Sequence, residues 1–191
     1  DLALENGLVT MYGKCGSVEY AKTTFQKMKR RDLLSWNAVI SACVQNEVSD
    51  DALKLVNKMV NEGIFPDKFL CSSVLSACAS AGAQERGREM HFFAVINSYE
   101  LDQAVGNATI NMYAKCGALV EAQYVFDMMQ IQDATSQTTL PEGYAKNGSL
   151  INGQEMVNKL SAQGIVCACT SLISGYVEYG FTEEAMINIE R

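Results

Sequence analysis

The sequence lacks both a long apolar run and an excess of positive charge. No stretch of 18 or more apolar residues occurs among its 191 residues, so no membrane-spanning segment is predicted. The net charge is −7, which argues against a protein that binds nucleic acid by bulk attraction to phosphate. Any binding to nucleic acid must therefore depend on local charge.

The sequence also lacks the residue patterns of a metal site or a catalytic centre. Seven cysteines are an odd number, and no two of them have the C-x-x-C spacing. The close pair Cys167 and Cys169 has no further ligands nearby for zinc. We therefore expect reduced, mostly buried thiols. We also expect no metal, no cofactor, no small-molecule substrate and no enzymatic activity.

The opening DLALENG has neither a starting methionine nor the basic and apolar pattern of a signal peptide. We therefore expect a segment of a longer protein from which any targeting segment is missing. The apolar fraction of 48% is that of a folded soluble protein.

Internal repetition is the strongest feature that is present. The stretches TMYGKCGSVEYAKTTF (10–25) and NMYAKCGALVEAQYVF (111–126) are nearly interchangeable. A small residue followed by apolar residues three, four and seven places later recurs along the chain, which is one face of an amphipathic helix. The small residues are Ala21, Ala52, Gly87, Ala122, Gly153 and Ala185.

A second helical stripe precedes each small residue, and it is clearest in Trp36, Val39, Ile40 and Cys43, which we interpret as core. Glycines mark the turn between the two helices, at Gly16, Gly117 and Gly148. Two short helices cannot bury their apolar faces alone, so successive pairs must stack into a solenoid. The predicted repeats are 2–32, 33–67, 68–102, 103–133, a less regular 134–165, and an incomplete 166–191.

Several sequence segments and the repeat lengths resemble the pentatricopeptide repeat family, in particular its plant-type subclass with alternating short, ordinary and long repeats. Here 2–32 and 103–133 are short, 33–67 is ordinary and 68–102 is long. The resemblance covers essentially the whole chain and implies an all-α fold, a right-handed α-solenoid of stacked antiparallel helix pairs. The alternative is the tetratricopeptide repeat, which keeps a 34-residue period and usually binds peptides. The segments that carry the resemblance are NGLVTMYGKCGSVEYAKTTFQKM, WNAVISACVQN, NEGIFPD, SSVLSACASAGA, NATINMYAKCGALVEAQYVFDMM and SLISGYVEYGFTEEA.

The resemblance implies a single-stranded RNA binder in which each repeat contacts one base. In the family the fifth and last residues of a repeat select the base, and asparagine with aspartate favours uracil, with cytosine second. The corresponding pairs are Asn6 with Asp32, Asn37 with Asp67, Ser72 with Asp102, and Asn107 with Asp133. The base preference of the long repeat, 68–102, is poorly defined in the family.

Other family roles carry over to further positions. The second residue of a repeat packs against the base, and here Leu34 and Phe69 hold that place, whereas Ala3 and Ala104 are small. A lysine near the end of the first helix faces the phosphates. Lys14, Lys115 and Lys146 hold that place and would give a basic stripe.

The fifth repeat departs from the pattern. Thr138 stands in the base-selecting position, but the closing position falls near Ile165, which cannot make a polar contact. Pro141 lies inside the first helix, where proline tends to break or kink it. We assign no base to this repeat.

Purely structural roles are an alternative explanation for several of these residues. The asparagines and aspartates are also good helix caps, and the basic run 27–32 suits a solvated helix end. His91 stands where Phe25 and Phe126 stand in other repeats, which predicts a packed structural histidine.

Our leading hypothesis is an RNA-recognition solenoid that guides cytidine-to-uridine editing of transcripts in a mitochondrion or chloroplast. Both the editing role and the organelle come from the resemblance, and editing-complex proteins would be partners. One alternative is an RNA stabilisation, processing or splicing factor with the same binding surface. The other is a protein-interaction scaffold without RNA affinity.

Overall fold

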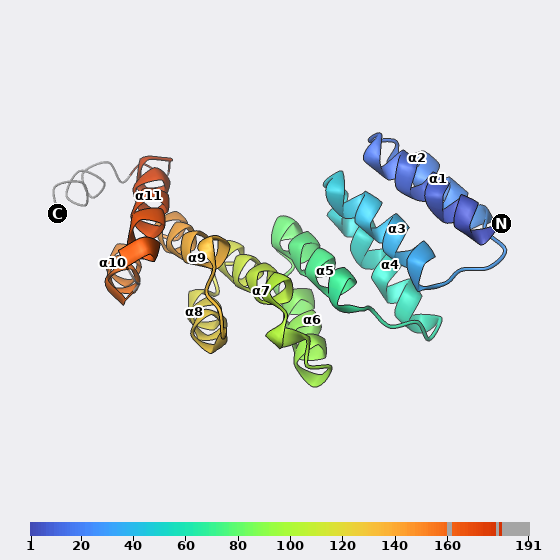
Figure 1. The fold of residues 1–191 in the computed structure, drawn as a ribbon. Helices are drawn as coiled ribbons and strands as arrows, with labels where there is room; N and C mark the ends of the chain where they lie inside the picture. The colour runs from blue at the N-terminus through green and yellow to red at the C-terminus, as the bar shows by residue number, and fades with distance from the viewer. Residues whose placement is uncertain (160–161, 179, 181–191) are drawn as a thin grey trace. The chain divides into compact units, whose positions relative to one another are not determined.

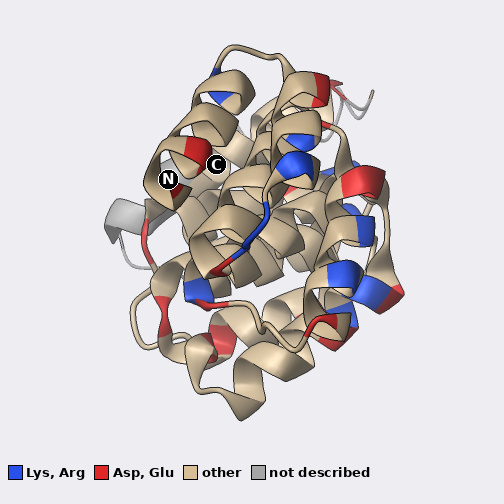
Figure 2. Cartoon of the chain, turned by 90° about the vertical axis from the view of Figure 1, so that its right-hand side faces the viewer, with Lys and Arg blue, Asp and Glu red and all other residues tan. Residues whose placement is uncertain are grey.

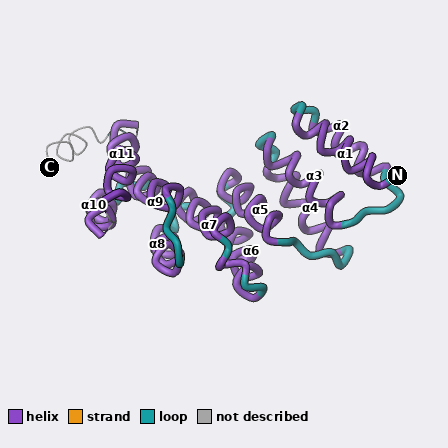
Figure 3. Tube along the Cα trace, in the orientation of Figure 1, coloured by secondary structure: helices purple, strands orange, loops and turns teal. Residues whose placement is uncertain are grey.

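The computed structural model describes residues 1–159, 162–178 and 180. Over these residues the chain forms helices and loops without a strand (Figure 3). None of the described helices is long and apolar enough to cross a membrane. The predicted all-α class is confirmed. The helices are α1 (Leu2–Lys14), α2 (Val18–Lys27), α3 (Leu33–Gln45), α4 (Ser49–Asn61), α5 (Lys68–Ala81), α6 (Gln84–Ile96), the 3-10 helix η1 (Tyr99–Leu101), α7 (Gln103–Lys115), α8 (Leu119–Met128), α9 (Ala134–Lys146), α10 (Leu150–Lys159) and α11 (Ala162–Glu178).

The chain divides into an N-terminal part, residues 1–105, and a C-terminal part, residues 106–191. In the N-terminal part α1, α3 and α5 pack side by side, and each pairs with the helix that follows it (Figure 1). The second helices α2 and α4 also contact the first helix of the next repeat. In the C-terminal part α9 packs against α8, α10 and α11. Each part is thus a stack of helix pairs, the architecture of an α-solenoid.

The predicted apolar stripe of α3 forms the core. Trp36, Val39, Ile40 and Cys43 are all fully buried. The Trp36 ring packs edge-on against Phe25 of the preceding helix, with ring centroids 4.6 Å apart. This packing joins the repeat 2–32 to the repeat 33–67 by an aromatic contact that adds to plain area burial.

The small residues of the second helices lie where helices meet. Ala21, Ala52 and Ala122 are fully buried, and Gly87 and Gly153 are buried. A Cβ added at Gly153 would lie only 2.8 Å from a methyl group of Leu172. The burial of these residues agrees with the helix face predicted for them, and Ala185 lies outside the described residues.

A second row of small residues, not predicted, sets the spacing of neighbouring first helices. A Cβ at Gly13 of α1 would meet the Ala42 Cβ of α3 at 2.5 Å. The same crowding recurs in the C-terminal part, at Gly143 with Ala114 (2.7 Å) and at Gly175 with Ala145 (2.6 Å). Adjacent first helices therefore approach closely enough to align their residues along one face.

The turn within each helix pair is left-handed, as predicted for Gly16, Gly117 and Gly148, whose φ angles are 74°, 77° and 68°. The equivalent residue of the repeat 33–67 is Glu47, with φ 61°. A residue with a Cβ is strained in this conformation, so this turn is less favourable than the others.

The predicted break at Pro141 is wrong, because α9 runs unbroken through it from Ala134 to Lys146. Proline removes one backbone donor, but Pro141 and its neighbour Leu140 are buried and packing holds the helix. Asp133 also caps the helix start. Residues 163–165, expected to close the fifth repeat, belong to α11, and the side chain of Ile165 lies outside the described residues.

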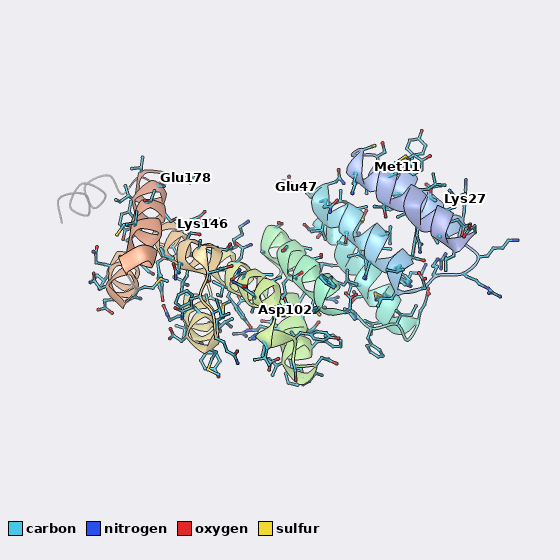
Figure 4. The ribbon with its side chains drawn as sticks, in the orientation of Figure 1. Met11, Lys27, Glu47, Asp102, Lys146 and Glu178 are labelled. Carbon is cyan, nitrogen blue, oxygen red and sulfur yellow. The ribbon has the colours of Figure 1, made fainter. Side chains whose placement is uncertain are left out.

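The basic run 27–32 begins at Lys27, which is the last residue of α2 (Figure 4). Arg31 turns back to donate to the carbonyls of Phe25 (3.2 Å) and Gln26 (3.0 Å), while Lys29 and Arg30 are exposed. This arrangement agrees with a helix end in solvent.

Two glycines of α1 give a matched test of the small-residue spacing. Gly13→Ala should destabilise the fold by about 1–3 kcal/mol, because the added methyl group overpacks the contact with Ala42. Gly7→Ala should stabilise it by about 0.5–1 kcal/mol, because nothing lies within 4 Å and alanine favours the helix. Urea unfolding followed by circular dichroism measures both. Equal effects of the two substitutions would contradict the proposed spacing.

Candidate functional site

The asparagines expected to select bases are each the fifth residue of a first helix. Asn6 lies in α1, Asn37 in α3 and Asn107 in α7. A capping side chain belongs to the residue just ahead of the first turn, and these three lie beyond it. The alternative in which the asparagines serve as N-caps is therefore wrong.

The aspartates that end three of the repeats do cap helices. Asp32, Asp67 and Asp133 precede α3, α5 and α9. Each carboxylate accepts a hydrogen bond from the backbone N–H three residues later, at 2.8 to 2.9 Å. This satisfies one of the free donors at the helix start and places a negative charge at the positive end of the helix dipole.

The same carboxylates also hold the asparagine of the preceding first helix. The amide nitrogen donates to the carboxylate in all three cases, so the structure brings these three predicted pairs together. The distances are 3.4 Å from Asn6 Nδ2 to Asp32 Oδ1, 3.1 Å from Asn37 Nδ2 to Asp67 Oδ2, and 3.2 and 3.1 Å from Asn107 Nδ2 to Asp133 Oδ1 and Oδ2.

Hydrogen bonds lower the pKa of two of these carboxyl groups. The hydroxyl and backbone N–H of Ser35 lower the pKa of Asp32 below its usual 3.8, and the Asn6 amide adds to this effect. Burial alone would raise the pKa of Asp133, but bonds from Ser136 and Asn107 outweigh it, and the net shift is downward. An ionised carboxylate only accepts hydrogen bonds, so it can bind the amide only through the amide nitrogen.

The amide oxygen of each asparagine is consequently left without a partner. Asn6 Oδ1, Asn37 Oδ1 and Asn107 Oδ1 are all buried, and none accepts a hydrogen bond. An unsatisfied buried acceptor is costly and uncommon, and three at equivalent positions need a common explanation. A donor supplied by a bound ligand would satisfy all three.

An open groove of about 500 Å³ lies between α1 and α3. Asn6 and Asn37 both line it, together with Leu34 and Lys14. The Leu34 side chain is 66% exposed and can pack against a flat ligand. The groove thus brings together two amides, an exposed apolar side chain and a lysine, all at positions to which the family resemblance assigns contacts with RNA.

The repeat 68–102 is built differently. Ser72 Oγ donates to the Phe69 carbonyl of its own helix at 2.8 Å. Asp102, labelled in Figure 4, lies just ahead of α7 and accepts from Lys68 Nζ at 2.9 Å and from the Ala104 N–H at 3.0 Å. The structure gives Ser72 and Asp102 separate partners and does not bring them together. Phe69 is 70% exposed, as a base-packing residue would be.

Thr138 also turns toward its own helix. Its hydroxyl is 2.9 Å from the Ala134 carbonyl and 3.0 Å from the Thr135 carbonyl. A hydroxyl that donates to the backbone in this way has no second hydrogen to offer a base.

The predicted phosphate-facing lysines lie at the ends of first helices. Lys115 and Lys146 both line a small pocket of about 70 Å³ between α7 and α9. Lys146 is labelled in Figure 4. Lys14 lines the groove of the N-terminal part, but Gln45 and Ser80 hold the equivalent places in the next two repeats. Basic and acidic positions are interspersed along the ribbon (Figure 2). The basic stripe is therefore interrupted.

Sequence reasoning missed three polar residues, namely the recurring pair Asn46 and Asn147, and Lys68. Asn46 donates to the Gly13 carbonyl of the preceding repeat at 2.9 Å, and Asn147 donates to the Ala114 carbonyl at 3.2 Å. Both follow the last residue of a first helix, and this recurrence was a usable signal. The other missed residue is Lys68, because only folding brings it to Asp102 across 34 residues.

The remaining titratable groups suit structural roles. Burial lowers the pKa of the half-buried His91 and raises the pKa of the Cys43 thiol to about 11. Burial also raises the pKa of Cys71 to about 12. Within the described part of the chain, no group of three or more His, Cys, Asp or Glu side chains could hold a metal ion.

Comparison with solved structures identifies the same fold in the pentatricopeptide repeat protein PPR10 from maize. Its crystal structure superposes with a TM-score of 0.77 at 20% identity, over 95% of this chain and 28% of that one. A second crystal structure of PPR10, in complex with an 18-nt psaJ RNA element, superposes with a TM-score of 0.50 at 19% identity, over 100% of this chain and 35% of that one.

Several curated relatives come from Arabidopsis thaliana. A putative mitochondrial pentatricopeptide repeat-containing protein is 38% identical over 86% of this chain and 26% of its own length. The chloroplastic protein DOT4 is 37% identical over 84% of this chain and 19% of its own length. The chain thus spans about a fifth to a quarter of the relatives it matches.

Family models match the repeats directly. The model described as PPR repeat family matches residues 31–80. The model described as PPR repeat matches residues 6–33, 107–132 and 167–187. Because these segments together span more than half of the sequence, the chain belongs to the PPR repeat family.

Proposed function

We propose that this chain binds single-stranded RNA in a sequence-specific manner, with one base per repeat. The observation that carries the proposal is the set of three buried amide oxygens without a partner, on Asn6, Asn37 and Asn107. A base edge offers donors to such an acceptor, through N3–H in uracil or the amino group in cytosine. The RNA-bound PPR10 structure supports RNA as the partner.

The geometry favours a pyrimidine opposite each asparagine. The aspartate fixes both the position of the amide and the direction of its oxygen, so the acceptor cannot follow a base of another shape. A purine edge lies farther from the sugar than a pyrimidine edge and would crowd a fixed amide. The expected RNA core is pyrimidine, pyrimidine, any base, pyrimidine, with uracil preferred. Following the resemblance, the N-terminal repeats lie toward the 5′ end.

The lysines supply local attraction to phosphate despite the net charge of −7. Lys14 and Lys115 end α1 and α7, the helices that carry Asn6 and Asn107, and Lys146 ends α9, the helix that carries Thr138. Each contact to a phosphate would release counterions, so binding should weaken as salt rises.

Within the whole protein, the proposed role of this segment is to guide cytidine-to-uridine editing of organelle transcripts. The aspartates Asp1, Asp32, Asp67, Asp102 and Asp133 stand 31, 35, 35 and 31 residues apart, and this mixture of lengths supports the subclass linked to editing. The chemistry would come from another domain or partner. Relatives named mitochondrial or chloroplastic support an organellar location.

RNA titrations with a double asparagine variant test the proposal. Fluorescence anisotropy would compare UUAU and UUGU cores with an AAAA core in the same flanking sequence. The wild type should prefer the pyrimidine cores, and Asn37→Ala with Asn107→Ala should remove most of that preference. Each lost hydrogen bond should weaken binding roughly 2- to 12-fold.

Two controls separate base selection from other effects. Asn61→Ala with Asn158→Ala changes one exposed asparagine on a second helix of each part and should leave the preference intact. Lys115→Gln should weaken all cores alike and reduce the slope of log affinity against log salt by about 0.7. Equal binding to every core by the wild type at low salt would reject base selection, and no detectable binding to any core would favour a protein-interaction scaffold.

A further inference from the structure

The repeat 68–102 differs from its neighbours in the partner of its closing aspartate. In the asparagine-bearing repeats the carboxylate accepts from the amide at the fifth position. In this repeat Asp102 Oδ2 accepts instead from Lys68 Nζ, at 2.9 Å. Lys68 is the first residue of the repeat, and the equivalent residues elsewhere are Leu2, Leu33, Gln103 and Ala134. The lysine is therefore peculiar to this repeat among those described.

Lys68 and the side chain at position 72 compete for the Asp102 carboxylate. They are four residues apart in α5 and so lie on one face of the helix. The bond between ammonium and carboxylate is charge-assisted, and it is stronger than one from a neutral amide or hydroxyl. While Lys68 holds the carboxylate, any side chain at position 72 lacks the support that fixes Asn37 and Asn107.

Lys68 also faces the exposed Phe69 ring, with Nζ 5.4 Å from the ring centroid. An exposed aromatic face stacks on any base, because every base has a π-face. The repeat therefore keeps a surface that binds a base but has no fixed acceptor that selects one.

We propose that Lys68 is a specificity-determining residue, which occupies Asp102 and makes the third base position tolerant of all four bases. The inference rests on the proposed function and goes beyond it, because it assigns the tolerance to one ion pair. The tolerance of the third position then has two causes, and the absence of asparagine at position 72 is only one of them. Restoring selection requires both the asparagine and the removal of the lysine.

A set of variants tests this inference in the full chain. Affinity is measured for RNAs that vary only at the third core position, UUNU. Ser72→Asn alone and Lys68→Met alone should each leave the four bases nearly equal. The double variant Lys68→Met with Ser72→Asn should prefer pyrimidines roughly 2- to 12-fold, the effect of one net hydrogen bond.

Lys54→Met serves as the matched control. Lys54 is another exposed lysine paired with an aspartate, Asp51, at 3.3 Å, but it lies on the second helix α4. Combined with Ser72→Asn it should produce no third-position preference. A full preference from Ser72→Asn alone, or none from the Lys68 double variant, would overturn the inference.

A second readout does not depend on RNA. Lys68 is the largest cause that lowers the pKa of Asp102. Lys68→Met should therefore raise that pKa toward its usual value in an NMR titration of the folded chain, and no rise would contradict the ion pair.

Preference at the first, second and fourth positions is measured in the same RNA-binding assay as preference at the third. If it is absent there in the wild type, the proposed function fails and the inference fails with it.

Discussion

One aspartate between successive repeats holds together the local fold and the candidate site. Asp67 shows the arrangement most clearly, because one carboxylate oxygen caps α5 through the Leu70 N–H and the other holds the Asn37 amide. The cap fixes where the carboxylate lies, and the carboxylate fixes the amide. The aspartate therefore caps a helix and holds the asparagine at the same time, so the two interpretations do not exclude each other.

Close packing of first helices gives this arrangement its regularity. Gly13 against Ala42 in the N-terminal part, and Gly143 against Ala114 in the C-terminal part, leave no room for a further methyl group. Asn46 and Asn147 bridge the same pairs of helices by hydrogen bonds to backbone carbonyls. Within each part, the helices that carry the selecting residues are thus held at a fixed spacing, which a ligand with regularly spaced bases requires.

Periodicity predicted the features that depend on local sequence. The buried stripe around Trp36, the left-handed turn at Gly16 and the small residue at Ala52 follow from helical spacing and from the chemistry of glycine. Local rules failed at Pro141, where tertiary packing keeps α9 intact. The sequence could not show that Lys68 pairs with Asp102, because folding brings the two together across 34 residues. It could not show the unpaired oxygen of Asn37 either, because that depends on which atoms surround the oxygen in the folded chain.

The central claim is that the Asn37 amide oxygen accepts a hydrogen bond from a pyrimidine edge. The most direct measurement is a double-mutant cycle that pairs Asn37→Ala with N3-methyluridine at the second core position of the RNA, since the methyl group removes the N3–H donor. We expect each change alone to weaken binding roughly 2- to 12-fold, and both together to weaken it no more than one alone. Independent, additive losses would contradict the account.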